Sequence, residues 1–211
     1  MTHLTPIDIP AWVMDQPLPG EVRLWVNAAR ERIQAFQDRW DRPQIEQFVA
    51  SDYELVYQTL AWIEQSQLAP GRRFLEWGCG FAVVCCLAAK LDFDVFGIEA
   101  EAVLIEEGRR TVTELQQPVE LFEGNFLPPD SEWLADDPTL PSLGHPVPSA
   151  YGEIGMEIDD FAIVFAYPWP GEEDFLADVF ARYAAPGALL LQFCGPYDLR
   201  LWRKGGRGAL A

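Results

Sequence analysis

The segment from Phe74 to Ala82 places the strongest constraint on the fold. It contains Phe-Leu-Glu-Trp-Gly-Cys-Gly-Phe-Ala, and an apolar run with two adjacent cysteines follows it directly. Gly78 and Gly80 allow a sharp turn and a close approach of the backbone to a ligand. We therefore expect a strand, a tight turn and the N-terminus of a buried helix, with a ligand crevice at the carboxyl end of the strand.

Short apolar runs alternate with amphipathic stretches throughout the chain after residue 72. We expect strands at residues 73–77, 95–99, 119–123, 161–166 and 188–193, and helices at residues 81–91, 102–116 and 172–185. Apolar strands separated by helices are typical of a parallel sheet covered on both faces. The predicted fold class is thus α/β: a three-layer α/β/α sandwich with a mostly parallel sheet.

The first 70 residues are predicted to form an N-terminal helical extension. The first twenty contain four prolines, which favour extended or irregular chain on the surface. Apolar residues at steps of three and four then predict a helix from Glu21 to near Asp41–Arg42. A second helix is predicted from Ser51 until Ala69–Pro70–Gly71 breaks it.

Residues 128–160 form a predicted insertion. They include six prolines and eight acidic residues, without Lys or Arg, and are too long for a simple connection between elements. Composition leaves two interpretations open: a partly disordered acidic loop, or a lid that closes over a substrate.

The charge balance bears on partners. Asp and Glu number 33 against 15 Lys and Arg, a formal net charge of −18. Binding of nucleic acid relies on basic residues, so a nucleic-acid partner is disfavoured and a neutral or cationic one fits better. The acidity is equally compatible with a role in solubility alone.

The remaining composition argues for a cytoplasmic protein without a metal. No N-terminal stretch has the pattern of a secretory signal, and the apolar run from Cys79 to Leu91 is too short to span a membrane. The four cysteines lack a Cys-x-x-Cys pair, and the histidines are only His3 and His145. We expect neither a zinc site nor a membrane partner.

Two acidic residues, Glu76 and Glu99, are predicted to lie near the glycine turn. Glu99 ends the next predicted strand, where a carboxylate can accept hydrogen bonds from both hydroxyls of a ribose. A dinucleotide fingerprint would need glycine where Val83 stands, and Glu76 would repel a pyrophosphate. The pair therefore favours a cationic ligand that carries adenosine.

These residues resemble the first motif of the class I (Rossmann-like) S-adenosylmethionine-dependent methyltransferases. The family pattern, acidic-x-Gly-x-Gly-x-Gly, is matched by Glu76, Gly78 and Gly80, with Ala82 at the third glycine. The resemblance implies a Rossmann-like fold and S-adenosylmethionine as cofactor, with Glu76 near the methionine amino group and Glu99 on the ribose. The candidate cofactor-binding residues are Glu76, Gly78, Cys79, Gly80, Glu99, Ala100, Asn125 and Phe126.

The last two candidates come from a weaker likeness further along the chain. Phe122-Glu-Gly-Asn-Phe126 follows the third predicted strand, where the family often has Gly-Asp before an apolar residue near the adenine. The resemblance implies that the Asn125 amide pairs with the adenine amino group and that Phe126 lies against the ring.

The segment from Phe165 to Pro170 resembles the family's acceptor motif in part. Members that methylate amines often carry Asn-Pro-Pro-Tyr here, and this chain has Tyr-Pro-Trp-Pro, without the amide or acid that accepts a hydrogen bond from an amine. Tyr167 and Trp169 are the candidate catalytic residues. An equal alternative is that both rings only fill space in the core.

Three functions stay open. The first is methyl transfer to an unidentified acceptor, with protein lysine or a small amine as the guesses. Lysine is included because the segment from Gln47 to Tyr53 resembles the entry loop of small lysine methyltransferases. The second is a non-catalytic protein that binds S-adenosylmethionine or a partner, and the third is an NAD-dependent oxidoreductase.

The resemblance also sets the expected layout. Residues 1–211 are predicted to form a single domain with a cofactor-binding core at 71–195. The family ends its sheet with an antiparallel hairpin of two further strands, and few residues follow the fifth predicted strand here. We expect five or six strands, a truncated C-terminal hairpin and, at most, one edge strand from Leu199 to Arg203.

Overall fold

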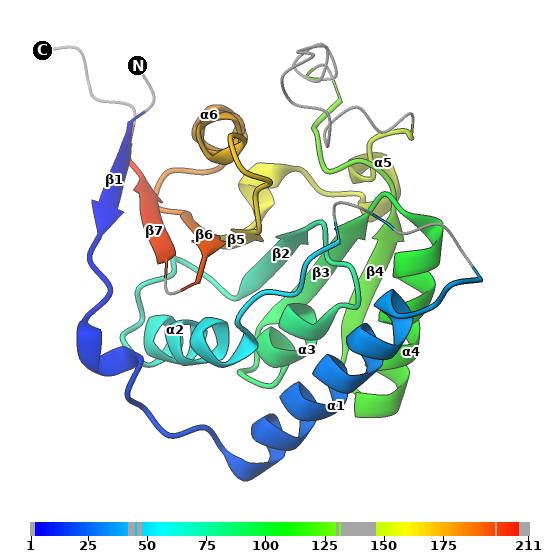
Figure 1. Cartoon of the computed structure of the whole chain (residues 1–211). Coiled ribbons are helices and arrows are strands. Elements are labelled where there is room, and N and C mark those ends of the chain that lie inside the picture. The colour runs from blue at the N-terminus through cyan, green and yellow to red at the C-terminus, as the bar shows by residue number, and fades with distance from the viewer. Residues whose placement is uncertain are drawn as a thin grey trace, which may run out of the picture.

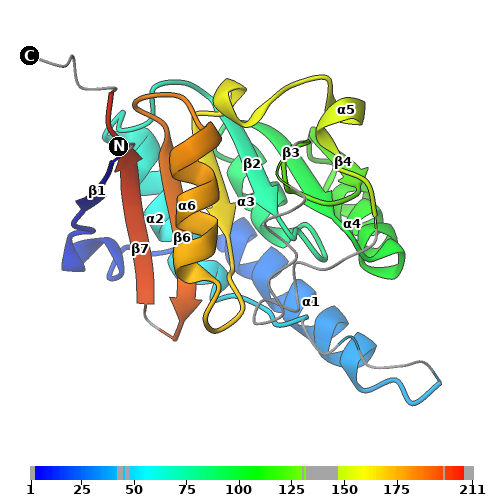
Figure 2. The same ribbon diagram turned by 90° about the horizontal axis from the view of Figure 1, so that it is seen from above.

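The chain forms a seven-stranded sheet between two layers of helices (Figure 1). The computed structural model describes residues 3–41, 45, 48–129, 131, 147–196 and 198–206. The strand order is β1-β7-β6-β5-β2-β3-β4. Figure 2 shows α6 lying over one face of the sheet, with α1, α2 and α3 behind the sheet. The predicted α/β sandwich is confirmed.

The elements follow the predicted alternation of strands and helices. The strands are β1 (Leu4–Ile7), β2 (Arg73–Trp77), β3 (Asp94–Glu99), β4 (Val119–Glu123), β5 (Ile163–Ala166), β6 (Leu189–Gly195) and β7 (Asp198–Lys204). The helices are α1 (Gly20–Gln37), α2 (Tyr53–Gln65), α3 (Val83–Ala89), α4 (Ala102–Leu115), α5 (Tyr151–Ile154) and α6 (Glu173–Tyr183), with short 3-10 turns at Ala11–Val13 and Ile158–Asp160.

Strand β2 lies in the middle of the parallel part of the sheet. It pairs in parallel with β3 on one side and with β5 on the other, and β4 and β6 extend the parallel set. Helix α3 packs against this centre, and all seven of its residues are buried. The carboxyl ends of the five parallel strands therefore lie on the same side of the sheet as the glycine turn.

The expectation of five or six strands and a truncated hairpin is wrong. Strand β7 pairs antiparallel with β6 along the whole length of a hairpin, and β1 pairs antiparallel with β7 through Leu4 and Lys204. The seventh strand thus comes from the N-terminal segment that was predicted to be irregular. Pro6 is compatible with this place because an edge strand can leave one side of its backbone unpaired.

The first helix is shorter than predicted. Helix α1 ends at Gln37, whereas its apolar spacing extended to Trp40, and Arg42 lies outside the described residues. The Trp40 side chain is 94% exposed, so no packing holds a further turn. Salt bridges from Arg32 to Glu107 and Glu114 join α1 to α4.

The predicted insertion is described only in part. Residues 130 and 132–146 lie outside the described residues, and so does His145. After them, Ser149 forms a parallel bridge with Asn125, and α5 follows. Among the described residues, none of the helices has the length and apolar character needed to cross a membrane.

Lys204 joins the β7 edge to the end of α6. Its side chain is buried, and the ammonium donates to the carbonyl oxygens of Ala184 and Arg182 at the C-terminus of the helix. We expect Lys204→Met to lower the free energy of unfolding by about 1–3 kcal/mol, because helix-end carbonyls lose a buried cationic donor. Urea titration measures the change. Arg200→Met, on the exposed side of the strand, is the control, and an equal loss in both variants would contradict the role of Lys204.

Candidate functional site

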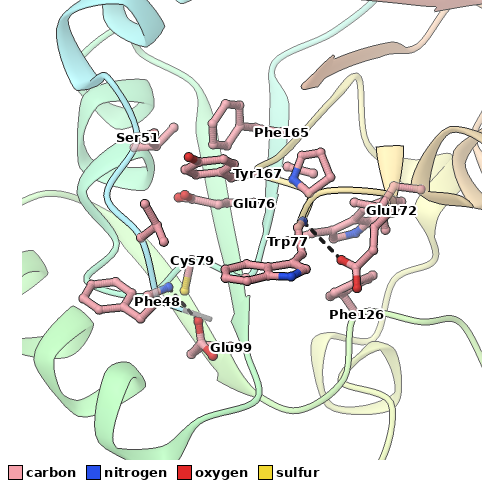
Figure 3. A pocket seen from close by; sticks show the side chains of 18 of the residues that line it. Phe48, Ser51, Glu76, Trp77, Cys79, Glu99, Phe126, Phe165, Tyr167 and Glu172 are labelled. Atoms are coloured by element: carbon pink, nitrogen blue, oxygen red, sulfur yellow. Dashed lines mark hydrogen bonds between the residues drawn. The ribbon is translucent and has the colours of Figure 1, made fainter. Parts of the chain in front are cut away.

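A cavity of about 500 Å³ opens at the carboxyl ends of the parallel strands (Figure 3). Its lining comes from the segment before α2, the glycine turn, the end of β3 with the start of α4, Phe126, the turn from β5 into α6, and the end of β6. This is the crevice that the sheet topology predicts for a ligand.

The glycine turn requires a backbone that few residues adopt. Gly78 and Gly80 have φ values of 70° and 51°, and Ala82 has a φ value of 54°. A side chain at Gly80 would also collide with Phe48, whose Cε2 lies 2.8 Å from the position of a Cβ. Phe48 stacks on Phe81, so the segment before α2 covers the turn from outside.

Glu99 binds the turn through its carboxylate. One oxygen accepts the backbone N–H of Gly80 at 2.7 Å, and the other accepts the N–H of Glu101 at 3.0 Å. The side chain is buried at the end of β3 and also lines the cavity. A carboxylate has about four lone-pair sites, so it can accept several hydrogen bonds at once.

Glu76 lies deeper in the cavity wall. One of its oxygens accepts both the backbone N–H and the thiol of Cys85, each at 2.9 Å. Burial raises the pKa of Glu76 to about 8 and outweighs the hydrogen bonds from Cys85, while the nearby charge of Glu99 adds to the rise. Without a ligand, the carboxyl group is therefore mostly protonated at neutral pH.

An aromatic wall reaches the cavity from the other face of the sheet. Trp77 is buried and stacks on Phe126 at 5.1 Å between ring centroids. Its indole N–H donates to the hydroxyl of Tyr151 in α5 at 3.0 Å. Helix α5, which belongs to the predicted insertion, thus fixes the orientation of a ring that lines the cavity.

The turn between β5 and α6 is held by two glutamates. Glu172 accepts the N–H of Trp169 at 3.2 Å, and Glu173 accepts the N–H of Gly171 at 2.9 Å. Tyr167 packs edge-on against Phe193 at 4.8 Å between centroids. Burial raises the pKa of the Tyr167 hydroxyl above its ordinary value.

Nine of the ten predicted site residues line this cavity. They are Glu76, Gly78, Cys79, Gly80, Glu99, Ala100, Phe126, Tyr167 and Trp169. Asn125 is not among the lining residues. Its side-chain oxygen accepts the N–H of Leu127 at 2.9 Å, and its backbone pairs with residues 148 and 150. Asn125 therefore shapes the turn that carries Phe126.

Trp77, Glu172 and Glu173 are among the lining residues that sequence reasoning missed. From the sequence, Trp77 is placed only in the predicted strand at 73–77, and the two glutamates only at the start of the predicted helix at 172–185. The closeness of Glu172 to the proline-aromatic turn was the available signal, because a residue three positions after Trp169 can contact its backbone.

The charge of the cavity is strongly one-sided. Five glutamates line it, namely Glu76, Glu99, Glu101, Glu172 and Glu173, and no Lys, Arg or His does within the described ranges. The same residues include no group of His, Cys, Asp and Glu arranged to hold a metal ion. The cavity suits a ligand with positive charge.

Three solved structures that align with this chain are methyltransferases. An O-methyltransferase from Bacillus cereus with S-adenosylhomocysteine aligns at a TM-score of 0.51 and 15% identity, over 86% of this chain and 70% of that one. The O-methyltransferase TomG from Streptomyces achromogenes, involved in tomaymycin synthesis and bound to S-adenosylmethionine, aligns at 0.50 and 18%, over 83% of this chain and 66% of that one.

A third solved structure extends the range of acceptors in this fold. An RNA methyltransferase from Salinibacter ruber with S-adenosylhomocysteine aligns at a TM-score of 0.50 and 14% identity, over 76% of this chain and 96% of that one. No protein-family model and no curated protein sequence matches the chain. The chain has the Rossmann-like fold of class I methyltransferases, as predicted.

The hydrogen bond between Trp77 and Tyr151 can be tested by removing the Tyr151 hydroxyl. Tyr151→Phe leaves a buried indole N–H without its acceptor, so we expect the free energy of unfolding to fall by about 1–3 kcal/mol. We also expect a shift in tryptophan fluorescence, because the Trp77 ring is released. Tyr183→Phe, on the partly exposed side of α6, is the control. Unchanged stability and fluorescence in Tyr151→Phe would contradict the anchoring role.

The buried acid makes a second prediction. The folded state holds the Glu76 proton up to a pH of about 8, whereas the unfolded chain releases it near 4.5. Stability therefore falls as pH rises through this window, because the folded chain must either keep the proton or bury a charge. We expect the free energy of unfolding of Glu76→Gln, relative to that of the wild type, to increase from about pH 5 to about pH 9. Urea unfolding without ligand measures this difference. A gain that does not grow with pH, or an equal gain in the exposed control Glu120→Gln, would contradict this.

Proposed function

We propose that this protein is an S-adenosylmethionine-dependent methyltransferase. The observation that carries the proposal is the left-handed turn at Gly78 and Gly80, which lies between two buried carboxylates, Glu76 and Glu99, in one cavity. Structures with the same fold hold S-adenosylmethionine or S-adenosylhomocysteine. S-adenosylmethionine supplies a methyl group that is already activated because it is bonded to a positively charged sulfur.

The lining fits this ligand chemically. In the proposed complex, Glu76 receives the methionine ammonium and becomes ionised, and Glu99 accepts the ribose hydroxyls while it keeps the backbone of Gly80 in place. Cys79 and Ala100 contact the cofactor from the turn and from the end of β3. Phe126 packs against the adenine, and Asn125 supports that turn through its bond to Leu127.

Catalysis consists mainly of positioning in this proposal. Bringing two reactants into line in a closed site can lower a barrier by several kcal/mol. The aromatic and proline residues of the β5–α6 turn, with Tyr167 and Trp169, exclude water from the acceptor side of the cavity. Burial raises the pKa of Tyr167 above its ordinary value, so its hydroxyl keeps its proton at physiological pH.

The acceptor is proposed to be an amine, carried by protein lysine or by a small molecule. Five cavity glutamates and a net charge of −18 favour a cationic acceptor over a phosphate backbone. Glu172 supplies an acidic group beside the turn that lacks the family's usual amide, which favours catalysis over simple binding of the cofactor.

Calorimetry with S-adenosylhomocysteine tests the proposal. We expect binding to the wild type, and binding at least about tenfold weaker in Glu99→Gln, because one ribose acceptor is lost. Circular dichroism of the variant controls for loss of the fold. The absence of binding to the folded wild type would rule the proposal out.

The pH dependence of the same titration tests the role of Glu76. At pH 7 its proton must leave before the carboxylate meets an ammonium group, since its pKa is about 8. We expect release of about one proton on binding, and an affinity that rises from about pH 6 and levels off above about pH 8. Calorimetry in buffers of different ionisation enthalpy measures the proton. Glu76→Gln should bind more weakly without releasing it, and proton uptake in the wild type would contradict the assignment.

A further inference from the structure

We infer that the β5–α6 turn and the facing Trp77 form a subsite for an alkylammonium group, with Glu172 as its anionic contact. This ammonium subsite, made of Trp77, Tyr167, Trp169 and Glu172, deepens the proposed function and rests on it. It names the chemical group of the acceptor and a residue that the family motif does not include.

The position of Glu172 is the first support. Its side chain is only 4% exposed, yet it lines the cavity. An ionised carboxylate in such a place is costly unless donors or a cation offset the lost hydration. One oxygen accepts the backbone N–H of Trp169, and a cationic ligand in the cavity would add a favourable charge interaction with the buried carboxylate.

The rings supply the second support. Trp77, Tyr167 and Trp169 all line the same cavity, and Figure 3 shows Tyr167, Trp77 and Glu172 around one open space. Aromatic faces attract alkylammonium groups, and Trp does so best. Aromatic rings beside a carboxylate therefore bind an alkylammonium group more tightly than a neutral alcohol of the same shape, because the alcohol has no charge for the carboxylate to attract.

The rigidity of the turn is the third support. Trp169 and Glu172 exchange two hydrogen bonds, because the N–H of Glu172 also donates to the carbonyl of Trp169 at 2.9 Å. Gly171 is tied to Glu173, and Pro168 and Pro170 restrict the backbone on both sides of Trp169. The subsite is therefore formed before a ligand arrives, which reduces the entropy lost on binding.

The reaction at this subsite balances without another reactant. The ammonium first loses a proton to bulk solvent as the amine enters the cavity. The nitrogen lone pair then forms a bond to the methyl carbon, and the carbon–sulfur bond breaks with its electron pair moving to sulfur. The products are the N-methylated amine and S-adenosylhomocysteine, and Glu172 stabilises the positive charge that the nitrogen regains.

A matched pair of probes tests the subsite without turnover. Choline and its neutral isostere 3,3-dimethylbutan-1-ol are titrated into protein saturated with S-adenosylhomocysteine, and tryptophan fluorescence reports binding. We expect choline to bind at least about tenfold more tightly than the alcohol. Glu172→Gln should remove about tenfold of the choline affinity and leave the alcohol unchanged, since the amide oxygen still accepts the N–H of Trp169.

Asp174→Asn is the control, because it removes one charge from the same first turn of α6 at an exposed site outside the cavity. An equal effect of both variants, or equal affinities for the two probes, overturns the subsite and leaves the proposed function intact as long as S-adenosylhomocysteine binds. Failure of S-adenosylhomocysteine to bind overturns both.

Turnover then separates the two sources of the same group. Butylamine and a peptide with one lysine carry equal alkylammonium chains, and mass spectrometry with labelled S-adenosylmethionine detects the transferred methyl. Product from butylamine alone supports a small-molecule amine, and product from the peptide alone supports protein lysine. Product only from matched alcohols or thiols overturns the ammonium subsite.

Discussion

The hydrogen bond from the Gly80 N–H to the Glu99 carboxylate holds the site together. It joins the turn after β2 to the end of β3, so two neighbouring strands share one rigid edge. Helix α3 follows this turn. All of its residues are buried, and it packs against the central strands. Phe48 then packs over Gly80, where any side chain would collide with it. The bond therefore stabilises a left-handed turn that lines the cavity and that few residue types adopt.

The glycine turn also lies beside two carboxyl groups whose burial is unfavourable when they are charged. Glu76 and Glu99 are both buried beside the turn, and the pKa of Glu76 rises to about 8 because water is excluded. A chain selected for stability alone would favour an amide at position 76. In the proposed complex, this carboxyl group releases its proton to solvent as it pairs with a cationic ligand, which links binding to pH and offsets the cost of burying the charge.

The sheet edge shows how much of this architecture is independent of the site. Strand β1 completes the sheet beside β7, far from the cavity, and Lys204 ties that edge to the end of α6. The other end of α6 begins at the turn that carries Trp169 and Glu172. Helix α6 therefore runs from the contact with Lys204 at one end to the turn that carries Trp169 and Glu172 at the other.

The sequence by itself determined the strand–turn–helix unit at Phe74–Ala82, the acid at the end of the next strand and the α/β alternation. These features are local: periodicity, glycine and short spacings are visible along the chain. Tertiary structure alone decided the pairing of Leu4 with Lys204, the bond between Trp77 and Tyr151, which are 74 residues apart, and the entry of Glu172 into the cavity. It also turned Asn125 toward Leu127. Such contacts depend on which surfaces pack together, and no spacing in the chain encodes that choice.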